Sequence, residues 1–405
     1  MTSIRVKYRP STAAGREGTV YYQIIHNRTV RRFMSSHTLR DDEWDKRNEC
    51  VAGGSPGDIA HTTRLRAVRF SISRDLDRLR RIIRKLDTVS MVYTADDVVD
   101  EYRRHLREYT LFNFMESVIA TLFKNGKLRT SEIYRATLNS FMKFRNGEDI
   151  MLDCLTPDVT QDYQQWLLAR GLSLNTVSFY MRVIRAVYNR AAEEEAIDGC
   201  NPFRHVYTGI GKTVKRALPV QSIRRIKLLD LRTAPALDYA RDMFMLSFYL
   251  RGMSFIDMAY LRKSNLTDGR LSYCRRKTGQ RLCIEWTDEM QSILDKYPAN
   301  TSEYLLPIIR SHVQNDRCVY RNMSYTINRN LKKVARSAGI RMSLTPYVAR
   351  HSWASAAQAN GIPLNVIREG MGHESETTTR IYLASLDTSA VDRANSIIIK
   401  ALKSK

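Results

Sequence analysis

The chain has 405 residues, 43% of them hydrophobic, which is enough for two or three domains with cores of their own. Its 65 Lys and Arg residues exceed its 42 Asp and Glu residues, and the net charge of +23 favours nucleic acid as a partner over a membrane surface. The sequence contains neither a signal peptide nor an apolar run of the ~20 residues needed to span a bilayer, so we expect a cytoplasmic protein without a membrane partner. Its six cysteines include no C-x-x-C pair, so we expect neither a disulfide framework nor a zinc site.

The first 90 residues are predicted to form a small basic β unit and a linking helix. After a break at 53–58, apolar residues recur at spacings of three and four from Leu65 to Leu86, with arginines on much of the opposite face, which we expect to be exposed to solvent. A basic sheet can bind a DNA groove or can simply favour solubility, and both interpretations stay open. Strand-like runs are predicted at 4–10, 20–25 and 29–36, and a turn is predicted at 26–28 between the last two.

The next part of the chain, 91–208, is predicted to be a helical bundle, in which Thr156 caps a helix that has Pro157 in its first turn. Many functions are compatible with such a bundle. Residues 209–220, GIGKTVKRALPV, are basic and indicate an exposed interdomain linker. The last domain, 221–405, is expected to be mainly helical. A strand-like insert interrupts the last domain at 271–285. Helical periodicity marks four segments of the bundle: 111–125, 130–146, 157–170 and 174–195.

The last domain contains side chains that suit DNA cleavage without a metal. A nucleotide-binding G-x-x-x-x-G-K-[ST] loop, an H-E-x-x-H pair and an acidic cluster are missing from the sequence, so we expect neither a cofactor nor a metal. YLRGMSFIDMAYLR contains Arg251, RRKTGQRLCIEW contains Lys277, and TPYVARHSWAS contains Arg350. In MGHESETTTRIYL, His373 follows Arg350 by 23 residues and Tyr382 follows His373 by nine.

This pattern resembles the signature of the tyrosine recombinase (phage integrase) family. That signature has an arginine after a buried helix, a lysine on a β-hairpin, H-x-x-R, a G-H box and a tyrosine nine residues beyond its histidine. Four residues match it in order and spacing: Lys277, Arg350, His373 and Tyr382.

The resemblance extends along nearly the whole chain and implies a multidomain, mainly α-helical fold with a small N-terminal β unit. Residues 1–90 resemble an arm-type DNA-binding domain, particularly that of integrases from Bacteroides-group mobile elements. Residues 91–208 resemble the helical, SAM-like core-binding domain, and LSLNTVSFYMRVIRAVYNRA is typical of its last helix. Residues 221–405 resemble the mixed α/β catalytic domain.

The resemblance also implies a role for each matching residue. Tyr382 would attack the phosphodiester, expel a 5′-hydroxyl and form a 3′-phosphotyrosine. The planar fork of Arg350 suits two phosphate oxygens, and fixed cations stabilise the charge of the transition state. Lys277 would protonate the leaving oxygen, and His373 would hydrogen-bond the phosphate or assist the tyrosine. Each residue also has a structural alternative, such as a packed tyrosine or, for Lys277, a mere phosphate clamp, and Arg276 competes for some of the work assigned to Lys277.

Two positions depart from the family pattern. Ser254 stands where the family has its first arginine, and Arg251, three residues earlier, would share a face with it if this stretch is helical. Arg251 is therefore a candidate to deliver the missing guanidinium. Tyr347 stands where H-x-x-R has its histidine; it either positions a phosphate oxygen by a hydrogen bond or is a packed aromatic residue.

We therefore expect a recombinase that integrates and excises a mobile element. The alternatives are an invertase of the same family and a non-cleaving DNA-binding protein with a decayed site; a type IB topoisomerase would need no arm domain. Expected partners are double-stranded DNA at core and arm-type sites, an accessory DNA-bending protein, and three further copies in a homotetramer on two DNA sites. The apolar stripe of the tail is expected to dock on a neighbouring protomer or on its own domain: Ile397, Ile398, Ile399 and Leu402.

Overall fold

The structure of this protein is a computed structural model. It describes residues 2–13, 15–53, 58–89, 92–194, 197, 201–211, 216–310 and 315–384, and in α14 the side chains of Thr378, Ile381, Tyr382 and Ala384 lie outside the described part. The apolar tail at 397–402 also lies outside the described residues. The chain divides into two compact units, Met1–Gly211 and Lys212–Lys405. In the part of the chain that the structure describes, none of the helices combines the length and the apolar character needed to cross a membrane.

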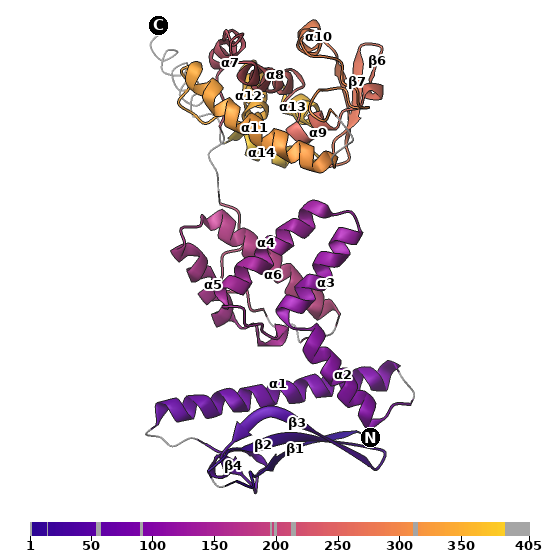
Figure 1. Cartoon of the computed structure of the whole chain (residues 1–405), viewed down its shortest axis with the longest axis vertical. Coiled ribbons are helices and arrows are strands. Elements are labelled where there is room, and N and C mark those ends of the chain that lie inside the picture. The colour runs from indigo at the N-terminus through magenta and orange to yellow at the C-terminus, as the bar shows by residue number, and fades with distance from the viewer. Residues whose placement is uncertain are drawn as a thin grey trace, which may run out of the picture. The chain divides into compact units, whose positions relative to one another are not determined.

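A three-stranded antiparallel sheet begins the first unit, with strand order β1-β2-β3 (Figure 1). The strands are β1 (Ser3–Arg9), β2 (Gly18–His26) and β3 (Thr29–Leu39). The turn between β2 and β3 consists of Asn27 and Arg28, with φ of 47° and 65°. Positive φ at both positions is what a two-residue hairpin between twisted strands requires. The predicted strands and turn are confirmed.

The sheet buries one face against two helices, α1 (Ile59–Val89) and α2 (Ala95–Glu108). Figure 1 shows α1 lying along the sheet. Residues of β2 alternate between buried and half-buried, and their core continues through α1 into α2. The core of the β unit therefore extends past residue 90, where sequence analysis placed a domain boundary. Two short strands, β4 (Trp44–Asp45) and β5 (Cys50–Val51), complete this part.

Four helices form the predicted bundle around a second core. The Thr156 and Ser173 hydroxyls accept hydrogen bonds from the amides of Val159 and Thr176, so each caps the helix that follows it. The predicted helices and the Thr156 cap are confirmed. The helices are α3 (Leu111–Lys124), α4 (Leu128–Phe144), α5 (Pro157–Ala169) and α6 (Leu174–Glu193).

Arg78 of α1 is buried, contrary to the expectation that the arginines of this helix form a solvent-exposed face. Its Nε and Nη2 donate to the two carboxylate oxygens of Asp153 at 2.7 and 2.6 Å, and its Nη1 donates to Asp75 at 2.7 Å. Burial alone would raise the pKa of Asp153, but hydrogen bonding and the charge of Arg78 lower it below its usual value. Asp153 lies in a 3-10 helix (Leu152–Cys154) before α5, so this ion pair links α1 to the bundle.

We predict that Arg78→Met lowers the stability of the first unit by about 3–5 kcal/mol, because it removes the cation that two buried carboxylates share and leaves Asp153 only the longer ion-pair contact with Arg81, at 3.4 Å. Amide hydrogen exchange in α1 of the full chain measures this loss. The matched control is Arg80→Met in the same helix, because Arg80 is 62% exposed and its pair with Asp77 is superficial. Equal protection in the two variants would show that the buried pair contributes nothing specific.

The second unit surrounds α8 (Pro235–Tyr249), most of whose residues from Ala240 to Ser247 are buried. The strand-like insert predicted at 271–285 is confirmed as the hairpin of β7 (Arg270–Cys274) and β8 (Arg281–Glu285), beside the short β6 (Leu266–Thr267). The remaining helices are α7 (Val220–Lys227), α9 (Phe255–Ala259), α10 (Asp288–Asp295), α11 (Asp316–Ser337), α12 (Pro346–Ala359), α13 (Leu364–Met371) and α14 (Glu376–Ala384).

The predicted linker, 209–220, contains the boundary between the two units. Gly211 donates its amide hydrogen to Asn175 of α6 at 2.7 Å. Leu218 is buried in the core of the second unit, and its amide donates to the Ser352 hydroxyl at 2.8 Å. The expectation of an exposed linker is therefore wrong at Leu218, because this apolar residue packs against the second unit. Residues 212–215 lie outside the described part.

Candidate active site

Two of the predicted site residues, Arg350 and His373, are in contact in the second unit, and Lys277 is near enough for its charge to lower the pKa of His373. Arg350 lies in α12, His373 follows the end of α13, and Lys277 lies in the turn between β7 and β8. Tyr382 lies in α14, but its side chain is outside the described part of the chain.

Arg350 is buried, and backbone carbonyls hold its guanidinium. Nη1 donates to the carbonyl of Gly252 at 2.9 Å, and Nη2 donates to the carbonyl of Met371 at 2.5 Å. Nη2 also lies 3.0 Å from Nε2 of His373. These bonds fix the orientation of the planar group, which has five N–H donors in a rigid fork.

Glycine is required at two positions beside these bonds. Gly252 has a φ of +72°, and a Cβ on it would lie 2.5 Å from the Cα of Arg350. Gly372 has a φ of +63° where α13 ends, and a Cβ on it would lie 2.9 Å from Leu282 of β8. Both positions combine a left-handed backbone, which favours glycine, with a close approach between two elements.

His373 is neutral, and its hydrogen bonds define its tautomer. Because an arginine can only donate, Nε2 must accept from Arg350, which leaves the proton on Nδ1. Nδ1 then donates to the Thr379 hydroxyl of α14 at 2.9 Å. Burial, followed by the charges of Arg350, Arg275 and Lys277, lowers the pKa of His373 from 6.5 to about 4.

Arg275 is a cation at this site that sequence analysis did not select. It is 8% exposed, and its Nη1 donates to the carbonyl of Gly372, directly after the Met371 carbonyl that Arg350 contacts. A signal was available in the sequence, because Arg275, directly after β7, continues the alternation of Leu271 and Tyr273 onto the buried face of the strand. The exposed Lys277 lies two residues further on, at the tip of the same hairpin.

Arg251 and Ser254 do not share a helical face, so that expectation is wrong. α8 ends at Tyr249, Arg251 has a left-handed φ of 58°, and Ser254 caps the separate helix α9. The helix breaks because Gly252 passes close to Arg350. The guanidinium of Arg251 donates weakly to the Cys283 carbonyl on β8 at 3.5 Å.

Tyr347 lies one turn before Arg350 in α12 and is 56% exposed. Its ring and that of His351 form a T-shaped pair with centroids 4.7 Å apart. Both interpretations of Tyr347 stay predictions, because its ring contacts His351 while its exposed hydroxyl could donate to a bound phosphate.

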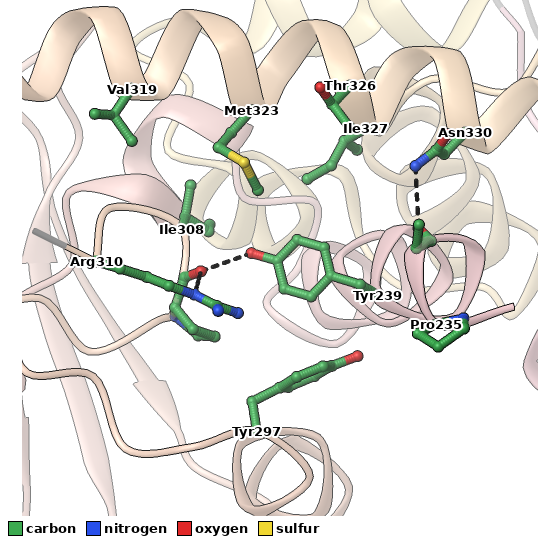
Figure 2. Close-up of a pocket in the computed structure, with 12 residues that line it drawn as sticks. Pro235, Tyr239, Tyr297, Ile308, Arg310, Val319, Met323, Thr326, Ile327 and Asn330 are labelled. Atoms are coloured by element: carbon green, nitrogen blue, oxygen red, sulfur yellow. Dashed lines mark hydrogen bonds between the residues drawn. The ribbon is translucent and has the colours of Figure 1, made fainter. Parts of the chain in front are cut away.

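A cavity of about 690 Å³ lies elsewhere in the second unit (Figure 2). Tyr239 projects into it and donates its hydroxyl to the Pro307 carbonyl at 3.0 Å, while Arg310 Nε donates to the same carbonyl at 3.1 Å. The predicted site residues lie outside its lining, and Figure 2 also shows Asn330, which donates to the Ala236 carbonyl at 3.1 Å. This cavity is therefore separate from the candidate active site. The described residues contain no group of three or more His, Cys, Asp or Glu side chains that could bind a metal.

Comparison with known proteins identifies the family. Residues 110–206 match the phage integrase SAM-like domain, and residues 226–389 match the phage integrase family. The tyrosine recombinase XerD of Pseudomonas aeruginosa is 23% identical over 267 residues, which cover 62% of this chain and 85% of that protein.

Solved structures share the fold at low sequence identity. A lambda integrase dimer bound to a COC′ core site covers 90% of this chain and 92% of its own, with 16% identity and a TM-score of 0.53. The match to a lambda integrase tetramer bound to a Holliday junction covers 88% of this chain and 94% of the integrase chain, with 16% identity and a TM-score of 0.52. The match to the Tn1549 transposon integrase in complex with a circular intermediate DNA covers 72% of this chain and 99% of the integrase chain, with 15% identity and a TM-score of 0.51.

The matched domains and the mainly helical fold with its small N-terminal sheet define a DNA strand transferase. The chain belongs to the tyrosine recombinase (phage integrase) family. It is a site-specific recombinase, an enzyme that cuts and rejoins DNA.

We predict that the His373 imidazole of the free protein stays neutral from pH 7 to about pH 5, because its pKa is lowered to about 4. NMR titration measures this, with the signal assigned by its loss in His373→Gln. Because the unfolded chain takes up this proton near pH 6.5 and the folded chain only near pH 4, the stability that neutral His373 contributes falls as the pH drops through that window. A titration midpoint near 6.5 would contradict the described contacts.

We predict that Gly252→Ala lowers DNA cleavage by about 100-fold, because the new Cβ displaces Arg350 and small misplacements of catalytic groups are this costly. Cleavage of a nicked duplex measures the effect. Gly269→Ala is the matched control, because Gly269 also has a positive φ (+67°) but nothing lies within 4 Å of the position of its Cβ. Both variants lose about 1 kcal/mol through backbone strain. Equal cleavage by the two variants would rule out the steric explanation.

Proposed function

We propose that this chain integrates and excises a mobile DNA element, with Tyr382 as the nucleophile that cuts the DNA. The observation that carries the proposal is the buried contact of Arg350 with His373 at the end of α13. The Lys277 hairpin adjoins it through Arg275, and α14, which contains Tyr382, follows it.

In the proposed reaction the Tyr382 hydroxyl oxygen attacks the phosphorus and loses its proton, and the bond from phosphorus to the 5′-oxygen breaks. Lys277 protonates the departing 5′-oxygen, which leaves a 3′-phosphotyrosine and a 5′-hydroxyl. The 5′-hydroxyl of a partner strand then attacks the phosphotyrosine and releases Tyr382. Arg350 stabilises the negative charge that develops on the phosphoryl oxygens.

His373 acts in this scheme as a neutral group. Its Nε2 accepts a hydrogen bond, so it can take the tyrosine proton or a contact from the substrate once phosphate engages Arg350. Its Nδ1–H bonds Thr379, which lies one turn before position 382 in α14. The His373–Thr379 bond therefore ties the helix of the proposed nucleophile to the end of α13.

The N-terminal unit supports a role in integration, because remote arm-type sites suit regulated integration more than simple inversion. Its sheet presents exposed basic residues that suit DNA phosphates: Arg5, Arg9, Arg28 and Arg32. The resemblance of this region to integrases of Bacteroides-group mobile elements points the same way. The Tn1549 integrase, which shares the fold, was solved with a circular intermediate DNA.

The proposed assembly is a homotetramer on two core sites, by analogy with the lambda integrase tetramer bound to a Holliday junction. Arm-type sites and an accessory DNA-bending protein belong to the same proposal. The competing function is a non-cleaving DNA-binding protein, and the observation that favours it is Ser254 in place of the family's first arginine.

We predict that the wild-type chain forms a covalent complex with a nicked duplex built from DNA that flanks its own gene, with EDTA present. A denaturing gel detects this complex. Tyr382→Phe abolishes it because the attacking oxygen is missing, while binding of intact DNA is retained. Tight, specific binding without a covalent complex would favour the non-cleaving function. A recombination assay then separates the two remaining functions. An integrase joins two attachment sites, whereas an invertase reverses the segment between its sites.

A further inference from the structure

We propose that Arg275 is a phosphate-binding residue of the active site and supplies the positive charge that Ser254 does not. This inference rests on the proposed function, because it assumes that the phosphate to be cut binds beside Arg350 and His373. It assigns to the β7–β8 hairpin a second cation in addition to Lys277.

The position of Arg275 is the first observation. Arg350 donates to the Met371 carbonyl and Arg275 donates to the next carbonyl, that of Gly372. His373 follows directly in the chain. Two guanidiniums from different elements therefore converge on one helix end beside the same imidazole. The charge of each lowers the pKa of His373, which shows that both act on the same small region.

The burial of Arg275 is the second observation. The side chain is 8% exposed, and among the described residues no carboxylate forms an ion pair with it. A buried cation without a counterion is costly, whereas an anionic ligand would relieve that cost. One bond to Gly372 orients the guanidinium without using all five of its N–H donors. In the same turn, the side-chain oxygens of Thr278 and Gln280 are buried without a hydrogen-bond partner in the described part of the chain.

Asp257 connects Ser254 to this hairpin. Its Oδ2 accepts from the Ser254 hydroxyl at 2.6 Å, and its Oδ1 accepts from the backbone amide of Arg276 at 3.0 Å. Asp257 therefore fixes the backbone immediately after Arg275. The serine hydroxyl is directed to Asp257, and the cation comes from the hairpin that Asp257 holds in place.

Neighbouring arginines fit this role less well than Arg275. Arg251 has a left-handed backbone and donates to Cys283 on β8. Arg276 is exposed and stacks its guanidinium on the Tyr260 ring at 4.2 Å. Arg275 is the member of this group that reaches the end of α13.

The test compares cleavage of two nicked duplexes by the full-length protein. One carries an ordinary scissile phosphate, and the other carries an uncharged methylphosphonate at that position. We expect Arg275→Ala to lower the cleavage rate of the phosphate by about 100- to 1,000-fold, as expected when a group that stabilises transition-state charge is lost. The loss is less than about 10-fold on the methylphosphonate, because this group develops less negative charge. Arg270→Ala, the matched control at the exposed start of β7, stays within about threefold of wild type on both substrates, because a single exposed side chain contributes little.

A rescue experiment separates charge from folding. Ser254→Arg, added to Arg275→Ala, is expected to restore phosphate cleavage at least about tenfold, since it returns one charged donor to the transition state. Equal losses on both substrates, or a loss caused by Arg251→Ala but not by Arg275→Ala, would overturn the inference. If the wild type cleaves and Arg275→Ala cleaves equally well, the inference alone fails. If the wild type binds its DNA and does not cleave it, the proposed function fails and this inference fails with it.

Discussion

The candidate active site depends on two consecutive carbonyl oxygens, those of Met371 and Gly372 at the end of α13. Arg350 donates to the first and Arg275 to the second, which brings α12 and the β7–β8 hairpin together beside His373. The last carbonyls of a helix lack partners within it and carry partial negative charge, so they attract cations. The left-handed Gly372 ends the helix and allows Leu282 of the hairpin to pack closely against it. The end of one short helix thus positions side chains from three elements.

The concentration of positive charge has a direct consequence for His373. Burial and three neighbouring cations make a second proton on the imidazole unfavourable, so Nε2 is left as a hydrogen-bond acceptor at neutral pH. A bound phosphate would reverse this balance, because it compensates the same cations that destabilise the imidazolium. The site is therefore organised for an anion before any substrate arrives, and such preorganisation favours a transition state that gains negative charge. This arrangement suits a DNA strand transferase.

Local chemistry made part of this structure predictable. Thr156 caps its helix as expected, and motif spacing selected Arg350 and His373, which the structure places in direct contact. The prediction failed where distant residues decide the outcome. Helical periodicity treats Arg78 as solvent-exposed because it does not include Asp153, its buried partner from another element. The break at Arg251 depends on the approach of Gly252 to α12, and local periodicity does not contain that contact either.

The location of Arg275 changes what holds the site together. An arginine at position 254 would stand at the start of α9, whereas Arg275 and Lys277 belong to the same hairpin and must move with it. The positive charges of Arg275 and Lys277 would then approach the phosphate together. Asp257 restrains one side of that hairpin through the Arg276 amide, and the Gly372 carbonyl restrains it through Arg275. Because Arg275 would bind the phosphate while it holds the Gly372 carbonyl, substrate binding and hairpin position would be coupled at the end of α13.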